Sequence, residues 1–279
     1  MNFRNLFKAA LFAVSTGMGT LAICASANAA SLTSVDIELS LLVDVSGSID
    51  ANEFNLQKQG YADVFSNAAL FNNFISKGKE GKIAVNYIYW SNSTQQQEAV
   101  GWTLIDSVQA SQDFANAINA ASRPFSGGTS PGSAIDFATP LFSSNEFDGE
   151  RQVIDVSGDG SGSISKTSSA RDNALNAGID AINGIVIGGN SSIKAFYENN
   201  VIAGVNGDGN PGFIVEAKTF ADFGSAIDKK IKAEIILTPP TTSIPEPGSI
   251  FGLIAVAGFG VSIAKRQYKT ILYLNKKDS

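Results

Sequence analysis

The chain has 279 residues, of which 44% are hydrophobic and 16% charged, a balance that favours a globular domain and excludes a disordered chain. It contains no histidine, which excludes Ser-His-Asp catalysis, Cys-His catalysis and every histidine metal site. A metal ion would therefore need oxygen ligands, which suit Mg²⁺, Ca²⁺ or Mn²⁺.

The first 29 residues predict a secretory signal peptide. Two basic residues within 1–8 precede an uncharged, mostly apolar stretch over 9–23, and "ASANAA" offers a cleavage site after Ala29. That stretch is short for a membrane-spanning helix. A lipid-attachment site at Cys24 is less favoured, because a bulky isoleucine precedes this cysteine. Cys24 is the only cysteine, so the mature protein would have neither a thiol nor a disulfide.

Apolar runs alternate with helical segments through the middle of the chain. The predicted strands are 36–43, 82–90, 97–105, 152–156, 181–187 and 212–217. The predicted helices are 51–75, 111–121, one after Ser130, 166–177, 191–200 and a last one after Thr219. This order predicts an α/β fold: a Rossmann-like, doubly wound, mostly parallel sheet with one antiparallel edge strand and helices on both faces.

Three segments carry oxygen ligands at the ends of predicted strands or just before helices. Asp44, Ser46 and Ser48 alternate in "LLVDVSGSID", Thr129 lies in "SGGTSPG", and Asp159 lies in "VIDVSGDG". Because ligands bind at the carboxyl rim of such sheets, we expect these segments to converge there. The hydroxyls can bind Mg²⁺, with Mn²⁺ or Ca²⁺ as alternatives, while the carboxylates hold its waters. The ion would keep one open position for an outside carboxylate.

These three motifs, in this order, resemble the von Willebrand factor type A (VWA) domain with a metal-ion-dependent adhesion site. The resemblance covers about residues 35–237, and we place the domain at 30–237. Within the family, the chain is similar to an exported bacterial subgroup whose function is not established. It implies a Rossmann-like fold and divalent-cation-dependent ligand binding, with the five residues above as the metal site. Asp159 follows "SG" rather than a plain apolar strand, which leaves Asp155 as a weaker candidate for the third segment's ligand.

The C-terminal segment has the pattern of a sorting signal or a membrane anchor. Residues 238–247 form a Pro/Thr-rich linker, 248–264 an uncharged transmembrane helix, and 265–279 a basic cytoplasmic tail. Pro245-Glu246-Pro247, the apolar helix and the basic cluster resemble the PEP-CTERM sorting signal of exopolysaccharide-producing Gram-negative bacteria. This implies processing by signal peptidase and an exosortase, then release to the cell surface or matrix. A plain C-terminal anchor is the alternative.

Residues 31–237 carry 13 Lys and Arg against 24 Asp and Glu, so a nucleic-acid partner is disfavoured and cations are favoured. We expect an exported binding or adhesion module that captures a carboxylate of a protein or acidic polysaccharide through its metal. One alternative is a magnesium-dependent hydrolase using a metal-bound water, with Asp44 or Asp155 as base. The chain lacks a G-x-S-x-G nucleophile elbow, and we do not expect an enzyme. Another is a structural matrix protein whose ion stabilises the fold.

Overall fold

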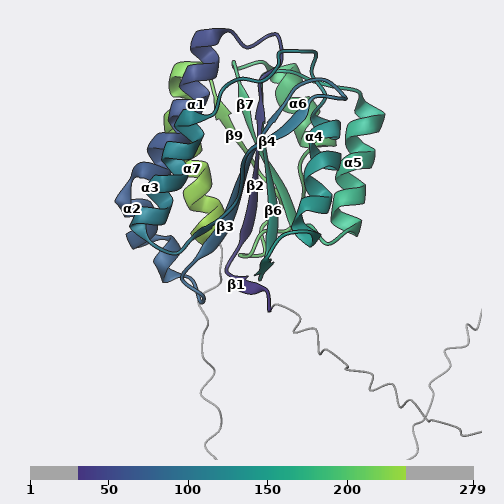
Figure 1. Ribbon diagram of the computed structural model, residues 1–279. Coiled ribbons are helices and arrows are strands. Elements are labelled where there is room, and N and C mark those ends of the chain that lie inside the picture. The colour runs from purple at the N-terminus through teal and green to yellow at the C-terminus, as the bar shows by residue number, and fades with distance from the viewer. Residues whose placement is uncertain (1–30, 237–279) are drawn as a thin grey trace, which may run out of the picture. The chain divides into compact units, whose positions relative to one another are not determined.

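A seven-stranded sheet forms the middle layer of the computed structural model, which describes residues 31–236 (Figure 1). Its strand order is β4-β3-β2-β6-β7, and β7 also pairs with two short strands. Only β4 and the short β8 run antiparallel to their neighbours. The strands are β2 (Glu38–Asp44), β3 (Ile83–Trp90), β4 (Gln96–Ile105), β6 (Gln152–Gly158), β7 (Ala181–Ile187), β8 (Ala203–Gly204) and β9 (Ile214–Ala217). The predicted mostly parallel sheet with an antiparallel edge strand is confirmed.

Helices cover both faces of this sheet, as the doubly wound fold requires (Figure 1). One face carries α1 (Ala51–Ser66), α2 (Ala68–Asn73), α3 (Val108–Ala120) and α7 (Phe223–Ile236). The other carries α4 (Pro131–Ala138), α5 (Ile164–Asn176) and α6 (Ser191–Asn200). Short 3₁₀ helices cover Ile75–Lys77, Thr139–Ser143 and Phe220–Asp222, and β1 (Thr33–Val35) pairs with β5 (Phe147–Gly149) in a separate two-stranded sheet.

The central strand β2 determines where the loop that carries Ser46 and Ser48 leaves the sheet. All seven of its residues are buried, because its alternate side chains enter the apolar cores on the two sides of the sheet. Leu41 and Val43 pack toward α1 and α7, whereas Leu42 packs toward α4. Strand β6 runs parallel to β2, with Val43 opposite Ser157. The loops that follow these two strands therefore leave the same rim of the sheet.

The first predicted helix, 51–75, is wrong in its second half. Asp50 and Glu53 form the predicted capping box, and α1 begins as expected. The helix ends at Ser66, however, because Asn67 adopts an extended conformation with ψ 110°. The Asn67 side chain accepts a hydrogen bond from Ala69 N at 2.9 Å and starts α2. This side chain competes with the backbone for helical hydrogen bonds, which is why the helix breaks there.

None of the helices within residues 31–236 combines the length and the apolar character needed to span a bilayer. The predicted signal peptide at 1–29, the linker at 238–247, the transmembrane helix at 248–264 and the basic tail lie outside the described residues.

Candidate metal centre

Five oxygen-bearing side chains meet at the carboxyl rim of the sheet, from three segments far apart in the sequence. Ser46 Oγ lies 3.1 Å from Ser48 Oγ. Thr129 Oγ1 donates to Ser46 Oγ at 3.2 Å, and Ser48 Oγ donates to Asp159 Oδ1 at 2.8 Å. Asp44 Oδ1 accepts from Ser46 N at 2.8 Å. The structure thus brings together all five residues that the sequence indicates, while their role as metal ligands stays a prediction.

The solvent exposure of these five side chains increases from the inner side of the cluster to its outer side. Asp44 and Ser46 are fully buried, Thr129 and Asp159 are half-buried, and Ser48 is exposed. A cation held among these oxygens would contact protein on its inner side and solvent on its outer side. This arrangement suits an ion that keeps water or an outside ligand at one coordination position.

Backbone contacts fix the loops that carry these side chains. Gly47 N donates to Gly127 O at 2.7 Å, and Gly127 N donates to Ser91 Oγ at 3.1 Å. Arg123 Nη2 donates to Val45 O at 2.8 Å and to Ser46 O at 2.7 Å. Sequence reasoning missed Arg123, since no local pattern marks an arginine that folds back on a strand end 78 positions earlier.

The electrostatics of Asp44 favour a bound cation. Burial raises the pKa of Asp44 to about 7, Ser46 opposes the rise through hydrogen bonds, and the charge of Asp159 adds to it. Asp44 Oδ2 is buried and has no hydrogen-bond partner within residues 31–236. Such an orphaned oxygen is costly unless a positive charge or a water approaches it. Two carboxylates and three hydroxyls therefore fit a hard divalent ion.

A second buried oxygen lies beside Asp44. The hydroxyl of Tyr197 is buried and also lacks a partner in the described part of the chain. A Cβ built at Gly158 would lie 2.5 Å from Tyr197 Oη and 2.8 Å from Asp44 Oδ2, so both oxygens approach the same glycine. Burial and the charge of Asp44 raise the pKa of Tyr197 well above its usual value, so the hydroxyl stays protonated and can donate. No sequence pattern indicated Tyr197.

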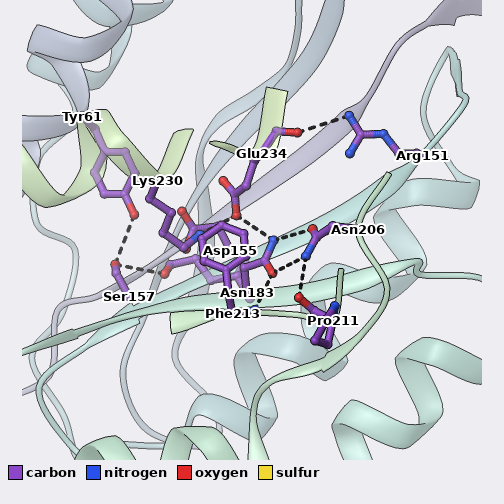
Figure 2. A network of polar contacts seen from close by, with 11 residues as sticks. Tyr61, Arg151, Asp155, Ser157, Asn183, Asn206, Pro211, Phe213, Lys230 and Glu234 are labelled. Atoms are coloured by element: carbon purple, nitrogen blue, oxygen red, sulfur yellow. Dashed lines mark hydrogen bonds and ion pairs between the residues drawn. The ribbon is translucent and has the colours of Figure 1, made fainter. Parts of the chain in front are cut away.

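Asp155 does not join this centre, which corrects its place as a weaker candidate ligand. It lies within β6 rather than after it, and its Oδ1 is 2.7 Å from Lys230 Nζ of α7 (Figure 2). Lys230 Nζ is also 2.5 Å from Glu234 Oε1, and all three side chains are fully buried. Paired in this way, Asp155 is available neither as a ligand nor as a general base.

The two buried carboxylates share one ammonium group. Burial raises the pKa of both Asp155 and Glu234, and Lys230 opposes the rise. Asn183 Nδ2 donates to Glu234 Oε1 at 3.0 Å and ties the pair to β7 (Figure 2).

Within the described residues no group of three or more carboxylate or cysteine side chains is placed to hold a metal. The hydroxyl-rich cluster at the rim is therefore the candidate centre.

The doubly wound sheet with this cluster at its carboxyl rim defines a protein of VWA-like fold. A family model matches residues 34–239, so the chain belongs to DUF1194, a family described as proteins of unknown function. No match was found among the curated proteins.

Solved structures share this fold at low sequence identity. Proximal thread matrix protein 1 (PTMP1) from the mussel byssus superposes with a TM-score of 0.53 at 16% identity, over 73% of this chain and 47% of the mussel chain. A form of PTMP1 with a zinc-occupied MIDAS motif gives 0.52 at 17% identity, over 73% and 46%. The pilus adhesin SpaC from Lactobacillus rhamnosus GG gives 0.50 at 13% identity, over 74% and 31%. This chain thus spans less than half of each, and the likeness concerns the fold.

Proposed function

We propose that residues 30–237 form an exported binding module that captures an acidic group of a partner through a divalent metal ion. The convergence of Asp44, Ser46, Ser48, Thr129 and Asp159 at one rim is the observation that carries this proposal. The zinc-occupied motif of the mussel protein supports a divalent ion, and the adhesin SpaC supports a role in attachment. We favour Mg²⁺, with Mn²⁺ or Ca²⁺ as alternatives.

Each residue has a separate task in this proposal. The hydroxyls of Ser46, Ser48 and Thr129 would contact the ion without cancelling its charge, and Asp44 and Asp159 would hold its waters from behind. The bound ion supplies an electrophilic position that attracts a carboxylate. Arg123 donates hydrogen bonds to the carbonyl oxygens of Val45 and Ser46, and so would fix the backbone of the loop that carries Ser46 and Ser48.

Thermal unfolding of the protein with and without metal tests the site. Mg²⁺ or Mn²⁺ should raise the unfolding midpoint, because an ion that binds only the folded state stabilises it by mass action. Ser46→Ala combined with Ser48→Ala should abolish this rise, since two of the three hydroxyl ligands are lost.

A matched control is Ser143→Ala with Ser144→Ala, two exposed neighbouring serines whose hydroxyls bind Pro140 O. This control should respond to metal as the unchanged protein does. A Ser46/Ser48 double variant that keeps the full metal response would show that the ion binds elsewhere.

Substrate turnover and carboxylate binding separate the two alternatives. A hydrolase would turn over phosphoester or ester substrates with Mg²⁺ and lose that turnover in Asp44→Ala, whereas a binding module shows no turnover. A purely structural ion would raise the unfolding midpoint but would bind no carboxylate. The ion pair with Lys230 already removes Asp155 as a base for the hydrolase.

We further propose that the chain reaches the cell surface or the exopolysaccharide matrix through its terminal segments. Signal peptidase would remove residues 1–29, and an exosortase would process the segment that follows residue 237. Until then the apolar stretch at 248–264 would hold the protein in the membrane. Mass spectrometry of the released protein tests this: a released chain that still contains residues 248–264 would contradict processing.

A further inference from the structure

Asp155, Lys230 and Glu234 form a buried group of reactive side chains that the candidate metal centre does not use (Figure 2). Asp155 comes from β6 and the other two come from α7, and all three are fully buried. Lys230 Nζ lies 2.7 Å from Asp155 Oδ1 and 2.5 Å from Glu234 Oε1. An amine in contact with one carboxyl group, with a second carboxylate beside it, is the set of groups that forming an amide requires.

The two contacts of Lys230 differ in geometry. The contact with Glu234 Oε1 is a hydrogen bond, and this oxygen also accepts from Asn183 Nδ2 at 3.0 Å. Both oxygens of Asp155 lack a hydrogen-bond partner within residues 31–236, although Lys230 Nζ is so close to Oδ1. The amine thus meets the Asp155 carboxyl group outside hydrogen-bonding geometry, and its distance to the carboxyl carbon exceeds 2.7 Å by at most one C–O bond length.

The surroundings of Asp155 favour uncharged forms of these groups. In the sheet Asp155 lies between Leu41 of β2 and Asn183 of β7, and the ring of Phe213 has its centroid 5.7 Å from Lys230 Nζ. Charges that are removed from water are costly, so a buried ion pair can exchange its proton and become an amine beside a carboxylic acid. These are the forms that react with each other.

From this geometry we propose that the protein modifies itself: the amine of Lys230 condenses with the carboxyl group of Asp155 to form an isopeptide bond, with Glu234 as the proton carrier. The inference concerns the interior between β6 and α7 and does not rest on the metal site.

The reaction balances without an oxidant or a co-reactant. A proton passes from Lys230 to Asp155, and the free electron pair of Nζ then attacks the carboxyl carbon to form the new N–C bond. Glu234 takes one proton from Nζ and passes it to a hydroxyl of the carboxyl group, which leaves as water when its C–O bond breaks. Glu234 returns to its starting state. Before the bond forms, Lys230 holds both carboxylates as the ion pairs described above.

Burial also suits Glu234 to this role and protects the product. It raises the pKa of Glu234 to about 7, while Lys230 opposes the rise, so this carboxyl group can accept and release a proton near neutral pH. Folding holds the amine and the acid together at an effective concentration on the order of 10⁵ M or more, which offsets the tendency of an amide to hydrolyse. The exclusion of water hinders the reverse reaction.

The proposed bond would supply a cross-link that the cysteine content does not. The only cysteine of the chain is Cys24, so residues 31–236 contain no disulfide. An amide between Asp155 and Lys230 would join α7 to the middle of the sheet across a long stretch of sequence. Such a cross-link restricts the unfolded chain and thereby stabilises the folded one.

Mass spectrometry of the purified full-length chain tests this inference. The intact mass should be lower by one water than the mass of the same chain without the bond. A tryptic digest should contain residues 152–166 joined through Asp155 to residues 230–232, because an amide on Lys230 blocks cleavage after it. The branched peptide is the decisive observation, since a cyclised Asp-Gly sequence also loses one water.

Two variants test the assigned roles. Glu234→Gln should leave most of the chain unlinked, because general acid–base catalysis contributes about 10²–10⁴ in rate. Lys232→Met is the matched control: Lys232 also pairs with an acid four positions away, Asp228, but at the partly exposed surface. This control should be linked as fully as the unchanged protein. Cooperative thermal unfolding of both variants shows that they fold.

Three outcomes would overturn the inference. One is a folded, unchanged protein with its full mass and no branched peptide. Another is an amide between Lys230 and Glu234 within α7, which would leave residues 152–166 as a free peptide. A folded Glu234→Gln variant that is fully linked would overturn the role of Glu234 as proton carrier. The first observation needs no variant, so it decides the matter even if a substitution prevents folding.

Discussion

Gly158 occupies a point where two buried oxygens leave no room for a side chain. A Cβ there would meet Tyr197 Oη at 2.5 Å and Asp44 Oδ2 at 2.8 Å, both too short for a real contact. Gly158→Ala should therefore push Asp44 from its place and destabilise the fold by about 1–3 kcal/mol, as overpacking does. It should also weaken metal binding. Urea unfolding and Mg²⁺ titration measure the two effects.

Gly101→Ala is the control for this change, because Gly101 also lies in a strand but a Cβ there would meet its nearest atoms only at 4.0 Å. It should change stability little and leave metal binding alone. Equal behaviour of the two variants would mean that the crowding at Gly158 is relieved without moving Asp44.

The sequence predicted some residues of this centre and not others, for a physical reason. Asp44, Ser46 and Ser48 are marked by local spacing at a strand end, and the parallel topology places the Asp159 loop at the same rim. Tyr197 and Arg123 belong to the centre only through folding, because their contacts join distant positions and follow no local period. Long-range packing of this kind leaves no pattern in a single sequence.

At the scale of elements, Lys230 links helix α7 to the sheet through two buried ion pairs (Figure 2). Lys230→Met should cost about 3–5 kcal/mol near neutral pH, because Asp155 and Glu234 would lose their buried cation and would have to stay charged without it or take up protons. Lys232 on the same helix also pairs with an acid four residues away, Asp228, but at the partly exposed surface. Lys232→Met should cost less than about 1 kcal/mol.

The effect of Lys230→Met depends on pH with a definite sign. The pKa of Glu234 is raised to about 7, above its usual 4.5, by burial. A raised carboxyl pKa contributes stability below the unfolded pKa, and that stability is lost as pH rises through the folded one. Removing the ammonium raises both carboxyl pKa values further, so the deficit should be smaller at pH 5 than at pH 8. Urea midpoints at both pH values measure it, and a deficit that grows on acidification would refute the pairing.

The start of a helix could be predicted from the sequence where a local hydrogen-bond pattern marks it, whereas other element boundaries could not. The capping box at Asp50 and Glu53 fixed the start of α1, because it is a local hydrogen-bond pattern. The break at Asn67 was missed, since an asparagine inside a helical pattern also occurs with its side chain in solvent. The small sheet of β1 and β5 was missed because its strands have three residues each, too few for any periodicity. Asp155 was wrong as a weaker candidate ligand, because a carboxylate within an apolar strand needs a buried partner, and its partner Lys230 lies on a distant helix that no local pattern connects to it.

The molecule as a whole is an acidic domain whose binding chemistry is gathered at one rim. Residues 31–237 carry 24 acidic and 13 basic side chains, while three of the five candidate ligands are neutral hydroxyls. The metal would thus be attracted by the field of the whole domain and held by ligands that add little charge of their own. An acidic partner is repelled by the same field and gains access through the metal.

This division of roles predicts how salt acts on metal binding. Raising NaCl from about 0.05 M to about 0.5 M shortens the distance over which surface charges act, so the attraction of Mg²⁺ by the domain should fade. The Kd for Mg²⁺ should rise roughly fivefold, whereas contacts inside the centre are screened much less. Isothermal titration measures this, with the Ser46→Ala/Ser48→Ala variant as the blank for ions condensed at the surface. A Kd that does not change with salt would contradict this prediction, because the affinity would then come from the local oxygen ligands and not from the charge of the acidic domain.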